Sequence, residues 1–170
     1  MVTGGLDKMK KMWYNHKGYR YNTDIKGVPN RDYMVETTEI QDMTDLSKEY
    51  FDQIAEFCKE KGAELILVSV PSMKNCNYKK HNAIQKLADQ YGVEFINLNL
   101  MQEEVPIDWE VDTRDKGDHL NHTGATKVTS YLGKYLTTTR DLKDHRLDKK
   151  YENWNKSLDS YIKTIETAHN

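Results

Sequence analysis

Two short, nearly continuous apolar runs with a helical pattern between them form the centre of the sequence. Residues 64–70 read ELILVSV and stop at Pro71, and residues 93–98 read VEFINL. Such runs are typical of strands covered on both faces in a parallel sheet. Between them, residues 79–91 place apolar side chains at helical spacing and end before Gly92. The pattern predicts a strand, helix and strand unit whose strands pair in parallel through a right-handed connection.

Helical patterns lie on both sides of this unit. Thr44 suits the cap of a helix over residues 44–61, which ends in lysines before Gly62. One face of this predicted helix is apolar and consists of Leu46, Tyr50, Ile54, Phe57 and Cys58. Residues 149–168 predict another amphipathic helix. Its apolar side consists of Tyr151, Trp154, Leu158, Tyr161, Ile162 and Ile165.

The amino-terminal residues have a different character. Residues 1–43 are rich in Tyr, Lys, Asn and Gly without a sustained period, apart from a short helical pattern over residues 6–13. The sequence therefore predicts an irregular amino-terminal segment (1–43), an α/β core (44–138) and a carboxyl-terminal brace helix (139–170).

A polar loop followed by a further helical pattern carries most of the candidate chemistry. Residues 112–136 read DTRDKGDHLNHTGATKVTSYLGKYL. The helix is expected to start near residues 121–123, where Asn and Thr side chains suit a cap. Its buried face should consist of Ala125, Val128, Leu132, Tyr135 and Leu136. Because residues 99–118 leave the carboxyl end of the second strand, they should deliver His119 to the edge where open α/β sheets bind ligands.

His119 is the candidate general base of this loop. An imidazole beside a carboxylate is the acid–base part of a hydrolase triad, since the carboxylate fixes the tautomer of the ring and stabilises its protonated form. Asp115, four residues earlier, is the favoured partner. Asp118 is the second choice because neighbouring side chains in an extended segment point to opposite sides, and Asp112 is a distant third. The alternative is that His119 only staples the loop by hydrogen bonds.

Composition narrows the classes of function. The 170 residues are 37% hydrophobic and 31% charged with a net charge of -2, which is typical of a folded domain and gives no basic surface for nucleic acid. No apolar run predicts a signal peptide or a membrane span. Cys58 is expected in the core, and Cys76 with His81 is only a weak nucleophile and base candidate. No spacing of His and Cys predicts a metal site, and no cofactor is implied.

The tripeptide HLN at 119–121, followed by TGA at 123–125, resembles the last sequence block of the SGNH/GDSL hydrolase superfamily. Aspartates just upstream and an amphipathic helix downstream add to the resemblance. The most similar branch is that of the bacterial envelope, with DltD-like and polysaccharide O-acetylation proteins. The resemblance extends over roughly residues 17–161. It implies an α/β fold of three layers, with an SGNH or flavodoxin-like parallel sheet flanked by helices, and a location in the bacterial cell envelope.

The resemblance also implies an activity, namely that of a serine esterase or O-acyl (acetyl) transferase on carbohydrate or cell-envelope esters. In this family the serine nucleophile stands in an amino-terminal block, and a glycine and an asparagine from middle blocks bind the oxyanion. The closing block has Asp three residues before the His, where this chain has Lys116. No Gly-x-Ser turn occurs before Thr44, so the domain is expected to be the carboxyl-terminal portion, incomplete at its amino terminus.

Three residues are candidates for substrate binding: Ser72, Trp109 and Asn121. Ser72 follows the carboxyl end of the first strand and is a weak substitute for the missing nucleophile, because a turn after Pro71 is its expected role. The alternative function is a non-catalytic binding or assembly module with an SGNH-like fold. A flavodoxin-like small-molecule binder is disfavoured because no glycine-rich phosphate loop follows either strand. The sequence makes no prediction of oligomeric state.

Overall fold

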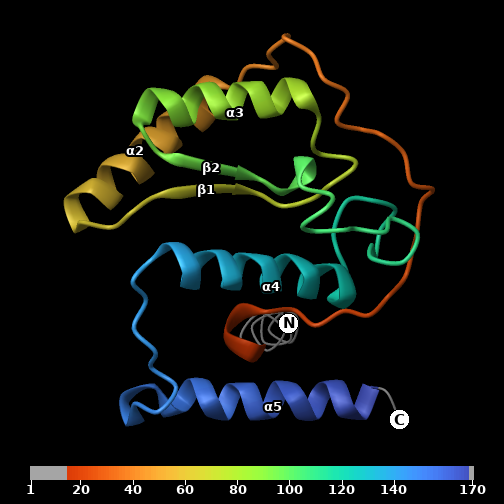
Figure 1. Cartoon of the computed structure of the whole chain (residues 1–170), viewed down its shortest axis with the longest axis vertical. Coiled ribbons are helices and arrows are strands. Elements are labelled where there is room, and N and C mark those ends of the chain that lie inside the picture. Colours follow the sequence, from red (N-terminus) through yellow and green to blue (C-terminus); the bar gives the residue numbers. More distant parts are fainter. Residues whose placement is uncertain (1–14, 169–170) are drawn as a thin grey trace, which may run out of the picture. The chain divides into compact units, whose positions relative to one another are not determined.

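Two short strands alternate with helices along the chain and pair as a small parallel sheet (Figure 1). The structure is a computed structural model and describes residues 15–168. Its contacts divide the chain into two compact units, Thr23–Gly133 and a second unit of Met1–Asn22 with Lys134–Asn170. The mixed α/β class is therefore confirmed. The predicted helix over residues 6–13 lies outside the described residues.

The centre of the larger unit is the predicted strand, helix and strand unit. Strand β1 (Ile66–Ser69) pairs in parallel with β2 (Glu94–Asn97), with Leu67 opposite Phe95 in the register. Helix α3 (Tyr78–Tyr91) connects the two strands. The side chain of Asn77 caps the helix by accepting from the Lys80 N–H, and Gly92 ends it in the left-handed region at φ 63°. The prediction of adjacent parallel strands is confirmed.

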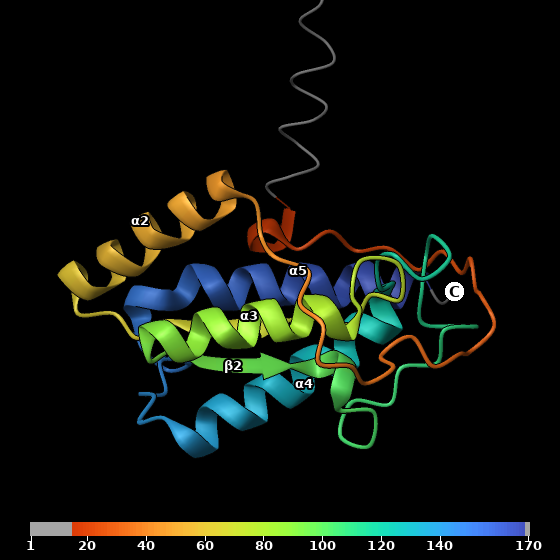
Figure 2. The same ribbon diagram turned by 90° about the horizontal axis from the view of Figure 1, so that it is seen from above.

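Helix α2 (Asp45–Lys61) forms where predicted, but its apolar face is not buried. Thr44 caps it by accepting from the Ser47 N–H, and Gly62 ends it at φ 64°. None of its residues is buried, and the four largest side chains of the predicted face are more than half exposed: Leu46, Tyr50, Ile54 and Phe57. Figure 2 shows that α3 runs over the sheet whereas α2 lies to one side of it. Helical periodicity identified the helix but could not show what covers it.

The expectation that β1 is covered on both faces is wrong for these residues. Val68 and the following Val70 are exposed, and no residue of β1 is fully buried. In contrast, Ile96 and Asn97 of β2 are buried. The described sheet has only two strands, so each strand pairs on one side only, and an apolar run does not by itself place a strand at the covered centre of a sheet.

The deepest packing lies just beyond the carboxyl end of β2. The chain passes from β2 into a short 3-10 helix, η2 (Leu98–Leu100), and then into an irregular loop. Leu98, Val105, Ile107 and Trp109 are almost completely buried. The segment between β2 and the polar loop therefore contributes several of the most deeply buried apolar side chains of this unit.

Helix α4 (His122–Thr139) follows the polar loop and is anchored at its first turn. The Asn121 side chain accepts from the Gly124 N–H at 3.2 Å, which caps the helix as predicted. Val128 is buried, and the rest of the predicted face is half-buried: Ala125, Leu132, Tyr135 and Leu136. Gly124 is also buried, because it packs directly against the backbone of Asp112.

The second unit is built around helix α5 (Glu152–Ala168), with the 3-10 helices η1 (Asn15–Gly18) and η3 (Lys149–Tyr151). The rings of Tyr19 and Tyr21 meet the ring of Tyr161 edge-on, at centroid distances of 5.6 and 6.2 Å. The Lys17 ammonium lies over the ring of Trp154. The predicted boundaries at residues 43 and 138, and the role of α5 as a brace, stay predictions. Within the described residues, no helix is long and apolar enough to span a membrane.

Two glycines of α4 should respond in opposite directions to alanine. At Gly133 an added Cβ meets nothing within 4 Å, so Gly133→Ala should raise the free energy of unfolding by about 0.5–1 kcal/mol. At Gly124 the Cβ would lie 2.6 Å from the Asp112 carbonyl oxygen, so Gly124→Ala should lower it by roughly 1–3 kcal/mol. Urea unfolding followed by circular dichroism measures both. Stabilisation by Gly124→Ala would show that α4 does not pack on this loop.

Candidate functional site

The polar loop before α4 is closed by a buried threonine. Thr113 and Leu120 form an antiparallel bridge, and the Thr113 side chain is completely buried. Its hydroxyl donates to the His119 carbonyl at 3.0 Å and accepts from the Gly117 N–H at 2.9 Å. Residues 113–120 therefore form a tight loop in which Asp115 and His119 face one another.

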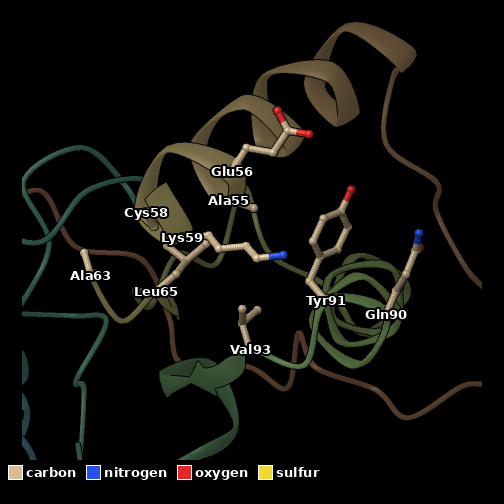
Figure 3. Close-up of a pocket in the computed structure, with 9 residues that line it drawn as sticks. All are labelled: Ala55, Glu56, Cys58, Lys59, Ala63, Leu65, Gln90, Tyr91 and Val93. Atoms are coloured by element: carbon tan, nitrogen blue, oxygen red, sulfur yellow. The ribbon is translucent and has the colours of Figure 1, made fainter. Parts of the chain in front are cut away.

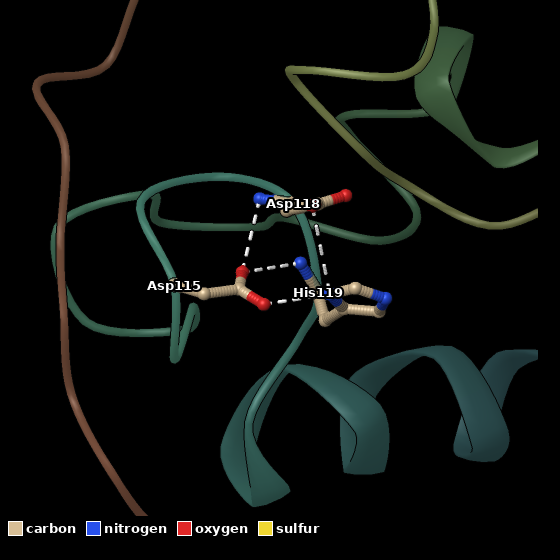
Figure 4. Close-up of side chains that lie close together, drawn as sticks. All are labelled: Asp115, Asp118 and His119. Carbon is tan, nitrogen blue, oxygen red and sulfur yellow. Dashed lines mark hydrogen bonds and ion pairs between the residues drawn. The ribbon is translucent and has the colours of Figure 1, made fainter.

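Asp115 holds His119 through both carboxylate oxygens (Figure 4). Oδ2 lies 2.6 Å from the imidazole Nδ1, and Oδ1 accepts from the His119 backbone N–H at 2.7 Å. Oδ1 also accepts from the Asp118 N–H at 3.2 Å. A carboxylate at Nδ1 favours the tautomer with its proton on that nitrogen. Figure 4 shows the second ring nitrogen on the side away from Asp115, and 58% of the His119 side chain is exposed.

The electrostatic balance at Asp115 favours the ionised carboxylate. Burial by itself acts to raise the pKa of Asp115. The backbone N–H of His119, the hydrogen bond to its ring and the charge of the ring act in the opposite direction and outweigh burial, so the pKa is lowered below its ordinary value. Asp115 is therefore a charged acceptor over the whole neutral range.

Asp118 is more distant from the ring and has another partner. One of its oxygens lies 3.8 Å from His119 Nδ1, and the other accepts from the Asn75 side-chain amide. The order predicted from the sequence, with Asp115 ahead of Asp118, agrees with these distances.

The loop that follows β1 holds the polar loop in place. The Lys74 backbone N–H donates to the Gly117 carbonyl at 3.1 Å, and its ammonium donates to the Asp115 carbonyl at 2.8 Å. Asn75 adds the bond to Asp118. Because residues 70–77 leave the carboxyl end of β1, the pair of Asp115 and His119 lies at the edge of the sheet where it was expected.

Asp112, the third carboxylate weighed as a partner for His119, belongs to a different interaction. It is 1% exposed, and its Oδ2 accepts from the Lys127 ammonium at 2.5 Å and from the Asp108 N–H at 2.8 Å. Its carbonyl accepts from the Asn121 N–H. Asp112 therefore ties the loop to α4 and does not orient the imidazole.

Ser72 is buried in the loop after β1, where its N–H and its hydroxyl oxygen both take part in hydrogen bonds. Its N–H donates to the Asn99 side chain at 2.9 Å, and its hydroxyl accepts from the Asn75 N–H at 3.2 Å. This is the turn role expected from the sequence. Hydrogen bonds link Ser72 to the site through one residue, because Asn75 donates from its backbone to Ser72 and from its side chain to Asp118. The Ser72 hydroxyl oxygen accepts a hydrogen bond within the turn.

The other two substrate-binding candidates are structural in character. Trp109 is 2% exposed and its ring meets that of Tyr33 edge-on at 5.6 Å. Both rings border a cavity of about 460 Å³, which Asn30, Arg31, Asp32, Met34, Asn99 and Gln102 complete. Asn121 caps α4, and its amide donates to the carbonyls of Asp24 and Val111. Within residues 15–168, neither Trp109 nor Asn121 contacts the imidazole of His119 in any hydrogen bond or ring contact that the structure shows.

A buried polar network beside the site was not predicted from the sequence. The Asn99 side chain accepts from the Tyr33 hydroxyl and donates to the Ser69 hydroxyl, and Ser69 Oγ lies 3.5 Å from Cys76 Sγ. Burial raises the pKa of Tyr33. The available signal was Asn97 at the end of an apolar strand and Asn99 two residues later, because polar side chains at the carboxyl ends of parallel strands lie at the edge where ligands bind. Cys76 and His81 are not brought together as a pair: His81 Nδ1 contacts the Asn97 amide instead.

The sequence predicted no metal, but three possible ligands do converge. Asp115, Asp118 and His119 each offer an atom within 4.8 Å of the others. Carboxylate and imidazole groups can coordinate a divalent cation. The same atoms already satisfy one another by hydrogen bonds, and no metal site follows from their proximity.

The comparisons with known proteins give no family. No family model, no curated protein and no solved structure matches the chain. The geometry of the loop is therefore the basis on which a function can be proposed.

The buried ion pair at Asp112 should contribute measurably to stability. Lys127→Met removes the ammonium and leaves a buried carboxylate with fewer partners. Loss of one member of a buried pair costs about 3–5 kcal/mol, and the partial exposure of Lys127 reduces the expected loss to about 2 kcal/mol. Lys134→Met, at an exposed position of the same helix, is the control and should change stability by about 0.5 kcal/mol or less. Urea unfolding measures both, and equal effects would show that the pair is not buried in solution.

The Thr113 hydroxyl should control the pKa of Asp115. Thr113→Val keeps the shape but removes both hydrogen bonds, so the pKa of Asp115 should rise toward its ordinary value of about 3.9, whereas Thr113→Ser should preserve the low value. Because the folded-state pKa is lowered, the stability contributed by Asp115 is present above its unfolded pKa and is lost as pH falls through the folded value. Carbon-13 NMR titration of the Asp115 carboxyl measures the shift. An unchanged pKa in Thr113→Val would show that Thr113 does not position the pair.

Proposed function

We propose that the chain carries the acid–base block of an SGNH-like serine esterase or O-acyl transferase acting on carbohydrate or cell-envelope esters. The one observation that carries the proposal is the imidazole of His119, fixed at Nδ1 by Asp115 with its other nitrogen open. The parallel pairing of β1 with β2 and the place of the loop at their carboxyl edge support the proposed three-layer fold.

The chemistry follows from this geometry. The open nitrogen of His119 accepts the proton of a serine hydroxyl as its oxygen attacks the ester carbonyl, and Asp115 stabilises the resulting imidazolium. The imidazolium then gives the proton to the departing alcohol. Water, or the hydroxyl of an acceptor sugar, then attacks the acyl-serine, and His119 takes its proton. As the acyl–serine bond breaks, the imidazolium returns that proton to the serine oxygen, so both groups are regenerated. Water as the second nucleophile gives hydrolysis, and a sugar hydroxyl gives transfer.

The nucleophile is the missing part of this site. In residues 15–168 no serine or cysteine forms a hydrogen bond with His119, and the Ser72 hydroxyl is held by Asn75. The resemblance to the superfamily implies a serine in an amino-terminal block, so we propose that a segment outside the described residues supplies it. A non-catalytic binding module is the alternative, since it would keep the same polar edge without a nucleophile.

The full natural polypeptide that carries these residues should hydrolyse a chromogenic acetyl ester. His119→Ala should lower kcat/KM on the order of a thousandfold, as expected for loss of a triad base. Asp115→Asn should cost less, and Asp118→Asn less again, because Asp118 is the more distant carboxylate. His122→Ala, in the first turn of α4, is the matched control and should retain activity.

Other results would contradict the assignment. Equal rates for wild type and His119→Ala would show that the histidine only staples the loop. Absence of acetyl esterase and transferase activity in a folded wild-type protein would favour the binding module. A larger loss in Asp118→Asn than in Asp115→Asn would mean that the orienting acid is wrong.

A further inference from the structure

His81 of α3 contacts a side chain of β2 whose donor and acceptor ends are fixed. The Asn99 backbone N–H donates to Asn97 Oδ1 at 3.1 Å, and the Asn99 side-chain amide donates to the same oxygen at 2.8 Å. A backbone N–H can only donate, so this end of Asn97 is the carbonyl oxygen. The other end is therefore the NH2 group, and its nitrogen lies 3.1 Å from His81 Nδ1.

This contact requires an unprotonated Nδ1 on His81. The Asn97 amide nitrogen is a donor, so Nδ1 must accept through its lone pair, and the proton of the neutral ring belongs on Nε2. A half-turn of the Asn97 amide would not accommodate a protonated ring, because it would turn the NH2 group toward the two Asn99 donors. The imidazolium form of His81 is thus incompatible with this arrangement.

The Asn99 side chain is fixed in the same way. Its Oδ1 accepts from the Ser72 backbone N–H at 2.9 Å, and its Nδ2 donates to Ser69 Oγ at 3.2 Å. Asn97 and Asn99 are 8% and 7% exposed, so water has little access to replace a lost partner. A proton on His81 therefore disturbs both asparagines.

The network continues into the loop that holds the acid–base pair. Ser72, whose N–H is bonded to Asn99, accepts from the Asn75 N–H at 3.2 Å, and the Asn75 side chain donates to Asp118. The Lys74 N–H donates to the Gly117 carbonyl at 3.1 Å. Residues 72–75 are thus tied to the two strand ends on one side and to the polar loop on the other.

His81 lies in the first turn of α3, where its ring is packed between other rings. It stacks on Phe95 at a centroid distance of 5.6 Å and meets Tyr78 edge-on at 5.1 Å. The other end of α3 borders a cavity of about 510 Å³ beside α2, with Tyr91 in its wall, and His81 is not among the described residues that line it (Figure 3). Burial lowers the pKa of His81.

The charged groups beside His81 are directed elsewhere. On α3, Lys79 pairs with Glu39 at 2.5 Å, and Lys80 donates to a carbonyl of the loop after β1 at 2.8 Å. On β2, Glu94 faces the opposite side of the strand from the ring that stacks on His81, because side chains alternate along a strand. The ring of His81 therefore meets an amide and aromatic groups and not a carboxylate.

Two further titratable groups belong to the network itself. The Tyr33 hydroxyl donates to Asn99 Oδ1 at 3.1 Å, and burial raises the pKa of Tyr33, so this donor stays protonated. Cys76 Sγ lies 3.5 Å from Ser69 Oγ, and either atom can donate in this contact. Both choices leave Ser69 Oγ able to accept from Asn99. His81 is therefore the group through which a proton reverses a bond of the network.

We propose that His81 is a proton-operated switch: uptake of a proton at Nδ1 breaks the bond to Asn97 and releases the loop after β1 that holds Asp115 and His119. The neutral ring accepts from Asn97 and keeps the network closed. The charged ring needs an acceptor at Nδ1 and turns away from the amide. This inference rests on the direction of the hydrogen bonds and does not depend on the proposed catalytic function.

The pH range follows from the folded-state pKa of His81, which burial lowers. The stabilisation that the neutral ring contributes is complete above its unfolded pKa of about 6.5 and is lost as pH falls from there toward the folded value. The network should therefore be closed at neutral pH and open under acid conditions.

NMR of the nitrogen-15-labelled protein tests the switch. At neutral pH the ring proton of His81 should be on Nε2. As pH falls from about 7.5 to about 5, the Asn97 side-chain amide and the Ser72 backbone amide should shift with the midpoint of His81. The hydrogen-exchange protection factor of the Ser72 amide should fall by about tenfold or more over the same range.

Three variants separate the switch from general acid unfolding. His81→Asn keeps an acceptor near the position of Nδ1 but does not titrate, so the protection of Ser72 should be the same at both ends of the pH range. His145→Asn, which replaces a half-buried histidine beside a tyrosine ring in the other unit, is the matched control and should keep the wild-type response. Asn97→Asp has nearly the same shape but places an acceptor at Nδ1, so the pKa of His81 should rise above about 6.5.

Any of three results would overturn the proposal. The first is a neutral His81 ring with its proton on Nδ1. The second is a loss of Ser72 protection at low pH that is as large in His81→Asn as in wild type. The third is a pKa of His81 that Asn97→Asp leaves unchanged or lowers, in a variant whose amide spectrum remains that of a folded protein.

Discussion

The buried carboxylate of Asp112 is the interaction on which the arrangement of the site depends. It accepts hydrogen bonds from the Lys127 ammonium of α4 and from the Asp108 N–H of the preceding loop. Its carbonyl receives the Asn121 N–H and touches Gly124 so closely that a methyl group would not fit. An ionised carboxylate is stable in a core only with such partners. The charge of Asp112 thus fixes where α4 begins relative to the polar loop.

Two further layers of contact build outward from this anchor. The Thr113 hydroxyl closes the loop, and the backbone and ammonium of Lys74 tie it to the segment after β1. Asp115 and His119 then meet with little freedom, although both are partly exposed. Rigid support below an exposed pair suits acid–base chemistry, because the geometry is set before a substrate arrives.

The same unit is well packed at one edge and open at another. Beyond the carboxyl ends of the strands the core is dense, with Leu98, Val105 and Ile107 fully enclosed. Around β1 and α2, apolar side chains remain exposed and a cavity lies between helix and sheet. The hydrophobic effect gives no reason for this composition unless a further segment covers it.

The sequence by itself determined the local elements and the identity of the facing pair. Local patterns predicted the positions of the helices and strands, because periodicity, the caps at Thr44 and Asn121 and the stops at Gly62 and Gly92 are short-range effects. Spacing alone favoured Asp115 over Asp118. Only the tertiary structure decided that Asp112 pairs with Lys127, that Thr113 closes the loop, and that the apolar faces of α2 and β1 are exposed. The ion pair, the loop closure and the exposure of an apolar face all depend on contacts, or missing contacts, between segments of the chain. An apolar stripe shows that a surface needs a partner, but the partner is fixed by the packing of the whole unit.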